Sequence, residues 1–116
     1  MDERTLEQLL ADVRDYLQIT WADEATDRRL SDMIQSSTVY LDKVTARSND
    51  YTKPGTMRTL LLERVRYQYN GALDAWLNNY LSLVIGAQLE SQSDALRAEA
   101  AAEGIAALAE GMGWRG

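Results

Sequence analysis

The sequence predicts an all-α protein: a small helical bundle built around one long helix, with an extended alanine-rich helical tail at the C-terminus. Three observations lead to this fold class. Apolar residues recur three and four positions apart over most of the chain, which is the spacing of one face of a helix. No stretch alternates apolar and polar residues as a half-buried strand would. The single proline lies in the one clear loop.

The first half of the chain predicts two helices. Thr5 and Gln8 stand three residues apart, as in a capping box, so the first helix is expected to begin at Thr5 and to end near Gln18. Its apolar stripe consists of Leu6, Leu9, Leu10, Val13 and Leu17. The second helix is expected from about residue 24 to about residue 46, with acidic side chains near its positive end. Its stripe consists of Leu30, Ile34, Ser37, Leu41 and Val44.

A loop and one long helix are expected next. Residues 48–55 are rich in turn-forming residues, and Pro54 is tolerated in the first turn of a helix. The apolar spacing then continues to Glu90, which predicts a helix over 54–90 that would be about 50 Å long if unbroken. Gly71 and Gly86 are its weak points, where a kink or a break would fall.

The predicted long helix carries apolar residues on two opposite faces. The face expected to pack on the core of the same chain consists of Leu61, Leu62, Val65, Tyr69, Ala72, Leu73, Trp76, Tyr80, Leu83 and Ala87. The opposite face consists of Leu60, Tyr67, Gly71, Leu81, Ile85 and Leu89. A surface helix needs only one apolar stripe to pack on its own core, and so short a chain has few elements left to cover a second one. We therefore expect other subunits to cover it.

The predicted subunit interface consists of Leu60, Arg64, Tyr67, Leu81, Ile85 and Leu89. Arg64 belongs to the only basic cluster, together with Arg58 and Arg66. Two interpretations stay open for this cluster: ion pairs with the acidic first half of the same chain, or one arginine that faces an acidic residue of a neighbouring subunit. The complementary surface is expected on the outer side of the second helix, near Met33 and Tyr40.

The composition changes after Glu90, which divides the chain into a helical domain over 1–90 and a C-terminal arm over 91–116. Residues 91–94 predict a hinge, and the alanine-rich residues 95–110 predict a further helix. Trp114 has no local residue to pack on, which is typical either of a frayed terminus or of a docking peptide. The docking interpretation involves Met112, Trp114 and Arg115.

The residue types present argue against catalysis. The chain has no histidine and no cysteine, so it lacks an imidazole base, a thiolate nucleophile and the usual zinc ligands. Asp23, Glu24 and Asp27 could in principle ligate a hard cation, but we interpret them as cap and first-turn acids of the second helix. We expect no enzymatic activity and no cofactor or metal.

Charge and hydropathy limit the partners. The net charge of −6 disfavours tight binding of a nucleic-acid backbone, although an acidic protein can surround DNA without gripping it. Met1 is followed by Asp2 and Glu3 rather than by a basic segment and an apolar run, so no signal peptide is expected. The 67–89 stretch is too polar for a membrane span. A soluble intracellular protein is expected.

Several blocks of the chain, in this order and spacing, resemble the head–tail connector (adaptor) proteins of long-tailed bacteriophages. These blocks are 9–19, 27–34, Lys53–Pro54, 61–70, Trp76 and 79–81. The resemblance covers about residues 6–90. It implies a helical bundle that assembles as a ring, generally twelve-fold, between the portal of the DNA-filled head and the tail.

The resemblance also implies partners and a location. The ring would bind the portal protein, extend the DNA channel without specific DNA contacts, and offer a platform for a stopper or tail-completion protein. By analogy with the family, the arm over 91–116 would dock on the portal. The protein would be made in the cytoplasm of the bacterial host and reside at the head–tail interface of the virion.

Two other classes of function remain open. A small acidic regulatory protein, of the antitoxin or anti-activator type, could bind a partner protein through its long helix. It would form a one-to-one or two-to-two complex and no ring. An orphan enzyme subunit is compatible with a helical bundle and with nothing else in the sequence.

Overall fold

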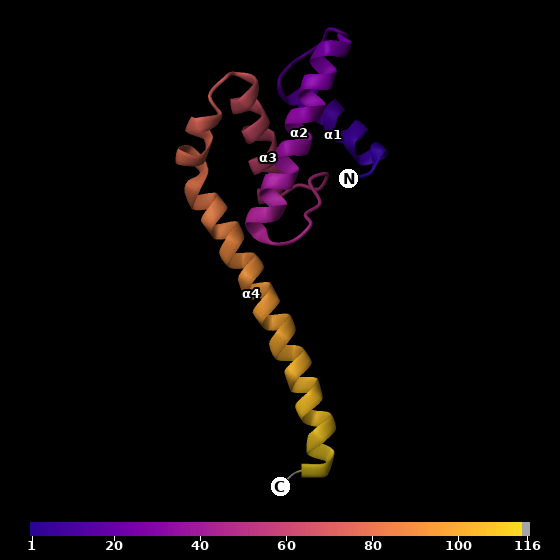
Figure 1. The fold of residues 1–116 in the computed structure, drawn as a ribbon, viewed down its shortest axis with the longest axis vertical. Coiled ribbons are helices and arrows are strands. Elements are labelled where there is room, and N and C mark those ends of the chain that lie inside the picture. The colour runs from indigo at the N-terminus through magenta and orange to yellow at the C-terminus, as the bar shows by residue number, and fades with distance from the viewer. Residues whose placement is uncertain (115–116) are drawn as a thin grey trace.

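The computed structural model describes the backbone of residues 1–114 and the side-chain surroundings of residues 1–104. These residues form four α-helices and no strand: α1 (Glu3–Tyr16), α2 (Glu24–Thr45), α3 (Thr56–Tyr69) and α4 (Leu73–Trp114). The predicted all-α fold class is therefore confirmed. Figure 1 shows that α1, α2, α3 and the first part of α4 form a bundle, from which the rest of α4 projects as a single helix. The molecule measures 71 × 31 × 19 Å.

Helix α1 begins earlier than the sequence predicts. Asp2 is its N-cap, and a carboxylate oxygen of Asp2 accepts a hydrogen bond of 2.7 Å from the backbone N–H of Thr5. The expected capping box that begins at Thr5 is therefore wrong, because an aspartate three residues upstream already satisfies that N–H. At the other end, the backbone N–H of Ile19 donates to the carbonyl of Arg14, and Ile19 is buried.

Helix α2 and the loop after it agree with the prediction. The helix spans Glu24–Thr45, and Leu30, Ile34, Ser37 and Leu41 of its predicted stripe are buried. The loop over 46–55 folds back towards α2, because the side chain of its residue Tyr51 is buried. The hydroxyl of Tyr51 donates a hydrogen bond of 2.6 Å to the Asp42 carboxylate, which ties the loop to the helix.

The predicted single helix over 54–90 is wrong: the chain reverses at residues 70–72, between α3 and α4. Gly71 has a φ of 73°, in the left-handed region that favours glycine. The N–H of Gly71 donates to the carbonyl of Gln68, and the N–H of Ala72 donates to the carbonyl of Tyr67. This is the Schellman pattern, which ends a helix by satisfying its last carbonyls. The other expected weak point, Gly86, lies inside the unbroken helix α4.

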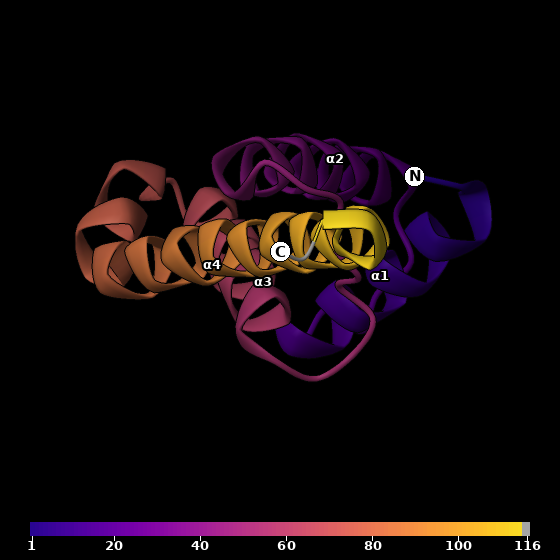
Figure 2. The ribbon, with the colours of Figure 1, turned by 90° about the horizontal axis from the view of Figure 1, so that it is seen from below.

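The core lies where α2 and α3 meet the other two helices. Helix α1 packs on one side of this pair and the first part of α4 packs on another, and the backbones of α1 and α4 do not come close to each other within the described residues. Figure 2, seen from below, shows α4 running across the front of the bundle, with α2 above it and α3 below it in the view. The fully buried large side chains are Trp76, Leu9, Leu30, Ile34, Leu41, Leu60, Leu61, Val13 and Val65.

Helix α4 passes through residues 91–94 without interruption, so the predicted hinge there is wrong. Ser91 is buried against the end of α2, where its hydroxyl donates to the carbonyl of Thr45. From residue 95 to residue 104 every side chain is exposed. The alanine-rich tail is thus helical, as expected, but it is the second half of α4 rather than a separate helix. The division into a domain over 1–90 and an arm over 91–116 stays a prediction.

A buried carboxylate joins α1, α3 and α4. Glu63 is only 7% exposed, and it accepts hydrogen bonds from the hydroxyls of Tyr16 (2.6 Å) and Tyr80 and from the guanidinium of Arg66 (2.7 and 2.8 Å). The bonds from Arg66, with those from the two tyrosines, lower the pKa of Glu63 to about 2. Burial and the bond to Glu63 raise the pKa of Tyr16 to about 12. The ionised carboxylate is therefore part of the fold.

We expect Glu63→Gln to lower the free energy of unfolding by about 2 kcal/mol at pH 7, because hydrogen bonds to a charged group are lost. The folded-state pKa of Glu63 lies below its usual value of 4.5, so its contribution is fully present above that pH and is lost as the pH falls towards 2. The difference between wild type and variant should therefore shrink below pH 4.5 in urea unfolding experiments. Glu7→Gln, at an exposed position of α1, is the control. A difference that does not change with pH would contradict this assignment.

Candidate subunit interface

Helix α4 carries an exposed row of apolar side chains, which we call the α4 stripe: Leu81, Ile85 and Leu89. Their exposed fractions are 47%, 44% and 60%. At about 100° per residue these side chains lie on one side of the helix. Leu77 and Leu96 extend the row at its two ends and are also exposed. Between Asp74 and Glu90 the helix has no charged residue.

The opposite side of α4 holds the helix on the bundle. Trp76, Val84, Ala87 and Ser91 are buried and follow one another at spacings of eight, three and four positions, on the side roughly opposite the α4 stripe. The Trp76 ring stacks near Tyr80 with ring centroids 6.2 Å apart and meets the edge of Tyr40 at 5.9 Å. Two apolar faces on one helix were predicted, and α4 has them. Only one of the two is covered within the described part of the protomer.

Leu60 does not belong to an exposed surface. It has no exposed area and lies in the core, so its placement on the outer face is wrong. The error follows from the helix break. Because the chain reverses at residues 70–72, α3 and α4 are two separate helices, and a face counted along one of them does not continue along the other. The prediction for Leu83 is wrong in the opposite sense: it was expected in the core, and its side chain is 43% exposed.

Tyr67 lies at the edge of the α3–α4 hairpin. Its ring is half-buried and meets the ring of Tyr80 edge-on at 5.9 Å, and its hydroxyl accepts a hydrogen bond of 2.8 Å from the Asn79 amide. The Arg66 guanidinium lies 4.9 Å from the centre of the same ring. These contacts make Tyr67 part of the hairpin, and its role in a subunit contact stays a prediction. The substitution Tyr67→Asp would therefore disturb the packing of the α3–α4 hairpin as well as any contact that Tyr67 makes with another subunit.

Arg64 is the one member of the basic cluster with no carboxylate partner among the described residues. Arg58 pairs with Asp12 at 3.0 Å and Arg66 pairs with Glu63 at 2.7 Å. The Arg64 guanidinium instead lies over the Tyr40 ring, 4.1 Å from its centre, and 5.0 Å from Trp76. Burial lowers the pKa of Arg64. Cation–π contacts thus hold this side chain in place without neutralising its charge.

The expected complementary surface near Tyr40 is wrong. Tyr40 is half-buried under Arg64 and beside Trp76, and Met33 is half-buried against the core. The exposed apolar residue of this part of α2 is Val39, which is 67% exposed. Val39 could not be identified from the sequence, because a single apolar residue outside the helical stripe gives no periodic signal.

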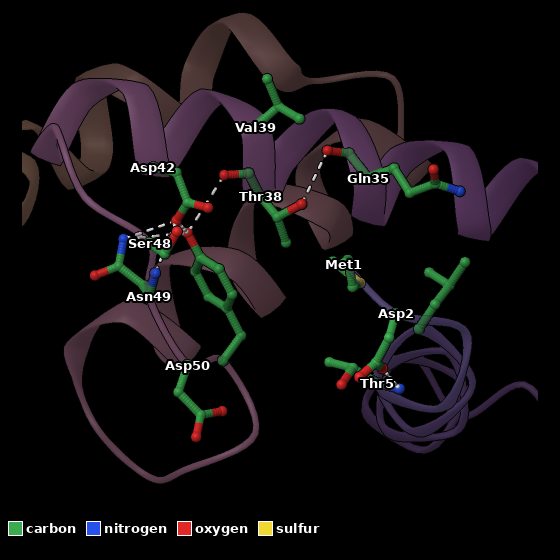
Figure 3. A pocket seen from close by; sticks show the side chains of 12 residues that line it. Met1, Asp2, Thr5, Gln35, Thr38, Val39, Asp42, Ser48, Asn49 and Asp50 are labelled. Atoms are coloured by element: carbon green, nitrogen blue, oxygen red, sulfur yellow. Dashed lines mark hydrogen bonds between the residues drawn. The ribbon is translucent and has the colours of Figure 1, made fainter.

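Val39 borders a cleft of about 430 Å³ between the start of α1, α2 and the loop over 46–55. Figure 3 shows its three walls: the first residues of the chain on one side, the outer face of α2 above, and the loop on the other side. We call it the α1–α2 cleft, and its lining residues are Met1, Asp2, Thr5, Leu6, Gln35, Thr38, Val39, Asp42, Ser48, Asn49, Asp50 and Tyr51. Met1 is 60% exposed. The loop anchor formed by Tyr51 and Asp42 gives the cleft its third wall.

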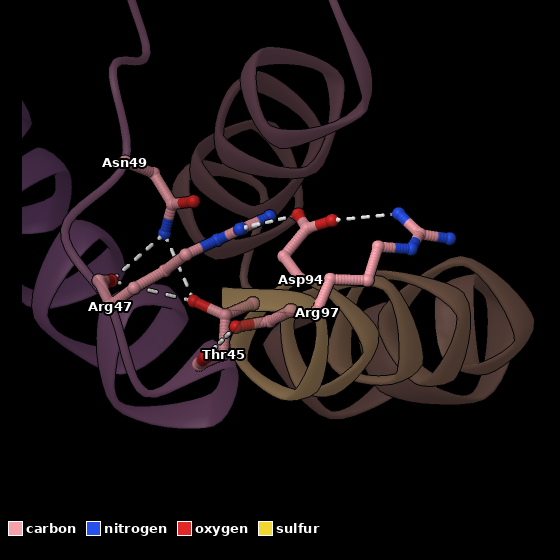
Figure 4. A network of polar contacts seen from close by, with 6 residues as sticks. Thr45, Arg47, Asn49, Asp94 and Arg97 are labelled. Carbon is pink, nitrogen blue, oxygen red and sulfur yellow. Dashed lines mark hydrogen bonds and ion pairs between the residues drawn. The ribbon is translucent and has the colours of Figure 1, made fainter. Parts of the chain in front are cut away.

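The point where α4 leaves the bundle is fastened to the C-terminal end of α2 (Figure 4). The amide of Gln88 donates to the carbonyl of Val44 at 3.4 Å, next to the bond from Ser91 to Thr45. Asp94 then pairs with Arg47 at 2.9 Å and with Arg97 at 3.3 Å. These contacts use side chains of α4 to satisfy the last carbonyls of α2, and they fix the direction of the projecting helix.

The predicted docking residues fall outside the part of the structure whose side chains are described. Met112 and Trp114 lie within the bounds of α4, and Arg115 lies beyond them. The docking hypothesis for these three residues therefore stays a prediction.

No family model, curated protein or solved structure matches the chain. Among the described residues, no helix combines the length and the apolar character that a membrane crossing needs. In the same residues no three acidic side chains come together in a group that could hold a metal ion.

Two matched leucine-to-alanine substitutions, one in the core and one on the surface, test these assignments by their effect on the free energy of unfolding. We expect Leu60→Ala to lower the free energy of unfolding by about 2–5 kcal/mol, because it opens a cavity at a fully buried site. The same change at Leu89, which is exposed, should cost less than about 0.5 kcal/mol. Urea unfolding of both variants in dilute solution measures the two values. Similar losses for both would show that Leu89 is part of the core of the protomer.

Proposed function

We propose that this protein is a structural virion protein that forms a ring between the portal and the tail of a long-tailed bacteriophage. The observation that carries the proposal is the α4 stripe. Leu81, Ile85 and Leu89 stand exposed on a helix without a charged residue between Asp74 and Glu90. Contiguous exposed apolar surface on a small protein is typical of a protein–protein contact. The sequence resemblance to head–tail connectors supplies the identity of that contact.

The projecting part of α4 supports a role as a connector. From residue 95 to residue 104 every side chain of α4 is exposed, and the helix continues to Trp114. A helix that leaves the bundle in a fixed direction can reach a partner at a distance from it. In the proposal this arm reaches the portal, and Met112, Trp114 and Arg115 dock there.

The charge of the chain supports the proposed path of the DNA. A net charge of −6 repels a phosphate backbone, so DNA can pass through a ring of such subunits without adhering. The stopper or tail-completion protein would bind the opposite end of the ring. The proposed location is the head–tail interface of the virion, after synthesis in the cytoplasm of the bacterial host.

A regulatory protein of the antitoxin or anti-activator type is the alternative. The α4 stripe fits it as well, because an amphipathic helix can lie in the groove of a partner protein. The two functions differ in stoichiometry: the alternative predicts a one-to-one or two-to-two complex and no ring.

Electron microscopy of the purified protein, alone and mixed with portal rings from its source, tests the proposal. We expect rings with a central hole, either free or seated on the portals. The control is a chain that ends at residue 94, which should retain the bundle but lose the portal contact. A protein that stays monomeric or dimeric and ignores portals would contradict the proposal and favour the regulatory alternative.

A further inference from the structure

The buried faces of α3 and α4 are in phase along the sequence, although the chain reverses between the two helices (Figure 1). Val65 of α3 and Trp76 of α4 are buried and stand eleven positions apart, which is about three turns of an α-helix. Tyr69 and Leu73 lie between them at steps of four and also pack against the core. If the chain continued as one helix through residues 70–72, these four side chains would therefore lie on the same face.

The turn between the two helices is short, and its sequence does not exclude a straight helix. It comprises residues 70–72, and Gly71 with its φ of 73° makes the reversal. The residue before α4 is Ala72, whose side chain cannot accept a hydrogen bond from the first N–H groups of the helix. In a continuous helix these N–H groups would donate to the carbonyls of residues 69–72 instead. A straight helix would thus satisfy backbone groups that the turn leaves without a side-chain cap.

The surface that holds α4 is formed by α2 and α3. The rings of Tyr40 and Trp76 meet there with centroids 5.9 Å apart, and the Glu63 carboxylate accepts a hydrogen bond from Tyr80. The bonds from α4 to the last carbonyls of α2 complete the contact. None of these contacts involves residues 70–72, so the α4 helix of a second copy can make every one of them. The partner that fits this surface is therefore another α4.

We propose that copies of this chain exchange α4. Residues 70–72 become helical, α3 and α4 join into one helix that begins at Thr56, and α4 packs on α2 and α3 of a second copy. Each contact inside the protomer is replaced by the same contact between copies, so the main cost is the lost independent motion of the copies. A high protein concentration thus favours exchange, and dilution favours the protomer. Exchange goes beyond the proposed function, because it defines a contact between copies with or without a portal.

Gly71→Ala tests the hinge. A Cβ at Gly71 would meet no atom within 4 Å, so the change acts through the backbone. Alanine disfavours the left-handed conformation of the turn and favours a helix. In analytical ultracentrifugation, the concentration at which half of the chains associate should therefore fall by about tenfold. Gly86→Ala, inside α4, where a Cβ would also meet no atom within 4 Å, is the control and should associate like the wild type.

A cross-link shows whether α4 has been exchanged. Arg47 and Asp94 form an ion pair of 2.9 Å between the end of α2 and α4, and both side chains are partly exposed. The chain has no cysteine, so Arg47→Cys and Asp94→Cys introduce the only thiols. A short thiol-reactive cross-linker should join these thiols within one chain in the protomer and between two chains after exchange. Denaturing electrophoresis separates the two products.

The double-cysteine chain, with and without Gly71→Ala, is refolded from urea at high protein concentration, and its associated fraction is cross-linked. We expect links between chains in both cases, with a larger associated fraction for Gly71→Ala. Links confined to single chains, or no associated fraction from either chain, would overturn the exchange. Association of Gly71→Ala no stronger than that of Gly86→Ala would overturn it as well.

If Gly71→Ala does not fold, the cross-links of the double-cysteine chain that keeps Gly71 decide alone. The portal experiment fails or succeeds separately. Links between chains without rings on portals would support the exchange and contradict the proposed function. Rings on portals in which every link stays within one chain would do the opposite.

Discussion

The chain reversal at Gly71 is the constraint on which the rest of the structure depends. A stretch whose apolar spacing suits one long helix is divided there, because the Schellman hydrogen bonds end α3 and a left-handed residue turns the chain. The reversal brings Tyr80 back to the Glu63 carboxylate and places Trp76 against Tyr40. It also sets which side of α4 faces outward.

The sequence predicted those parts of the fold that periodicity determines. The second helix and its stripe match the structure, since each residue of that pattern packs on the same core. Periodicity cannot detect a helix break whose two sides are both apolar, so the break at Gly71 appeared only as a weak point. The absence of a hinge at residues 91–94 depends on a tertiary contact, the bond from Ser91 to the end of α2, which no local pattern encodes.

The candidate interface was predicted in part for the same reasons. Ile85 and its neighbours on α4 were placed on the outer face, where they lie, because they share one uninterrupted helix. Leu60 was assigned to that face by counting through the break, and it is buried. The α1–α2 cleft could not be predicted at all. It exists because the hydrogen bond from Tyr51 to Asp42 holds the loop against α2. This bond joins a loop residue to a helix residue, and the helical spacing of apolar residues does not indicate it.

The central claim is that the exposed stripe of α4 lies in a contact between subunits, and electron microscopy of two matched variants tests it most directly. Ile85→Asp places a charge in the middle of the stripe, and Ser36→Asp places one at an exposed position of α2. Mixed with portal rings from the source, the Ser36→Asp chain should form rings like the wild type, and the Ile85→Asp chain should form none while it keeps its helix content. Rings formed equally well by the Ile85→Asp chain would contradict the account.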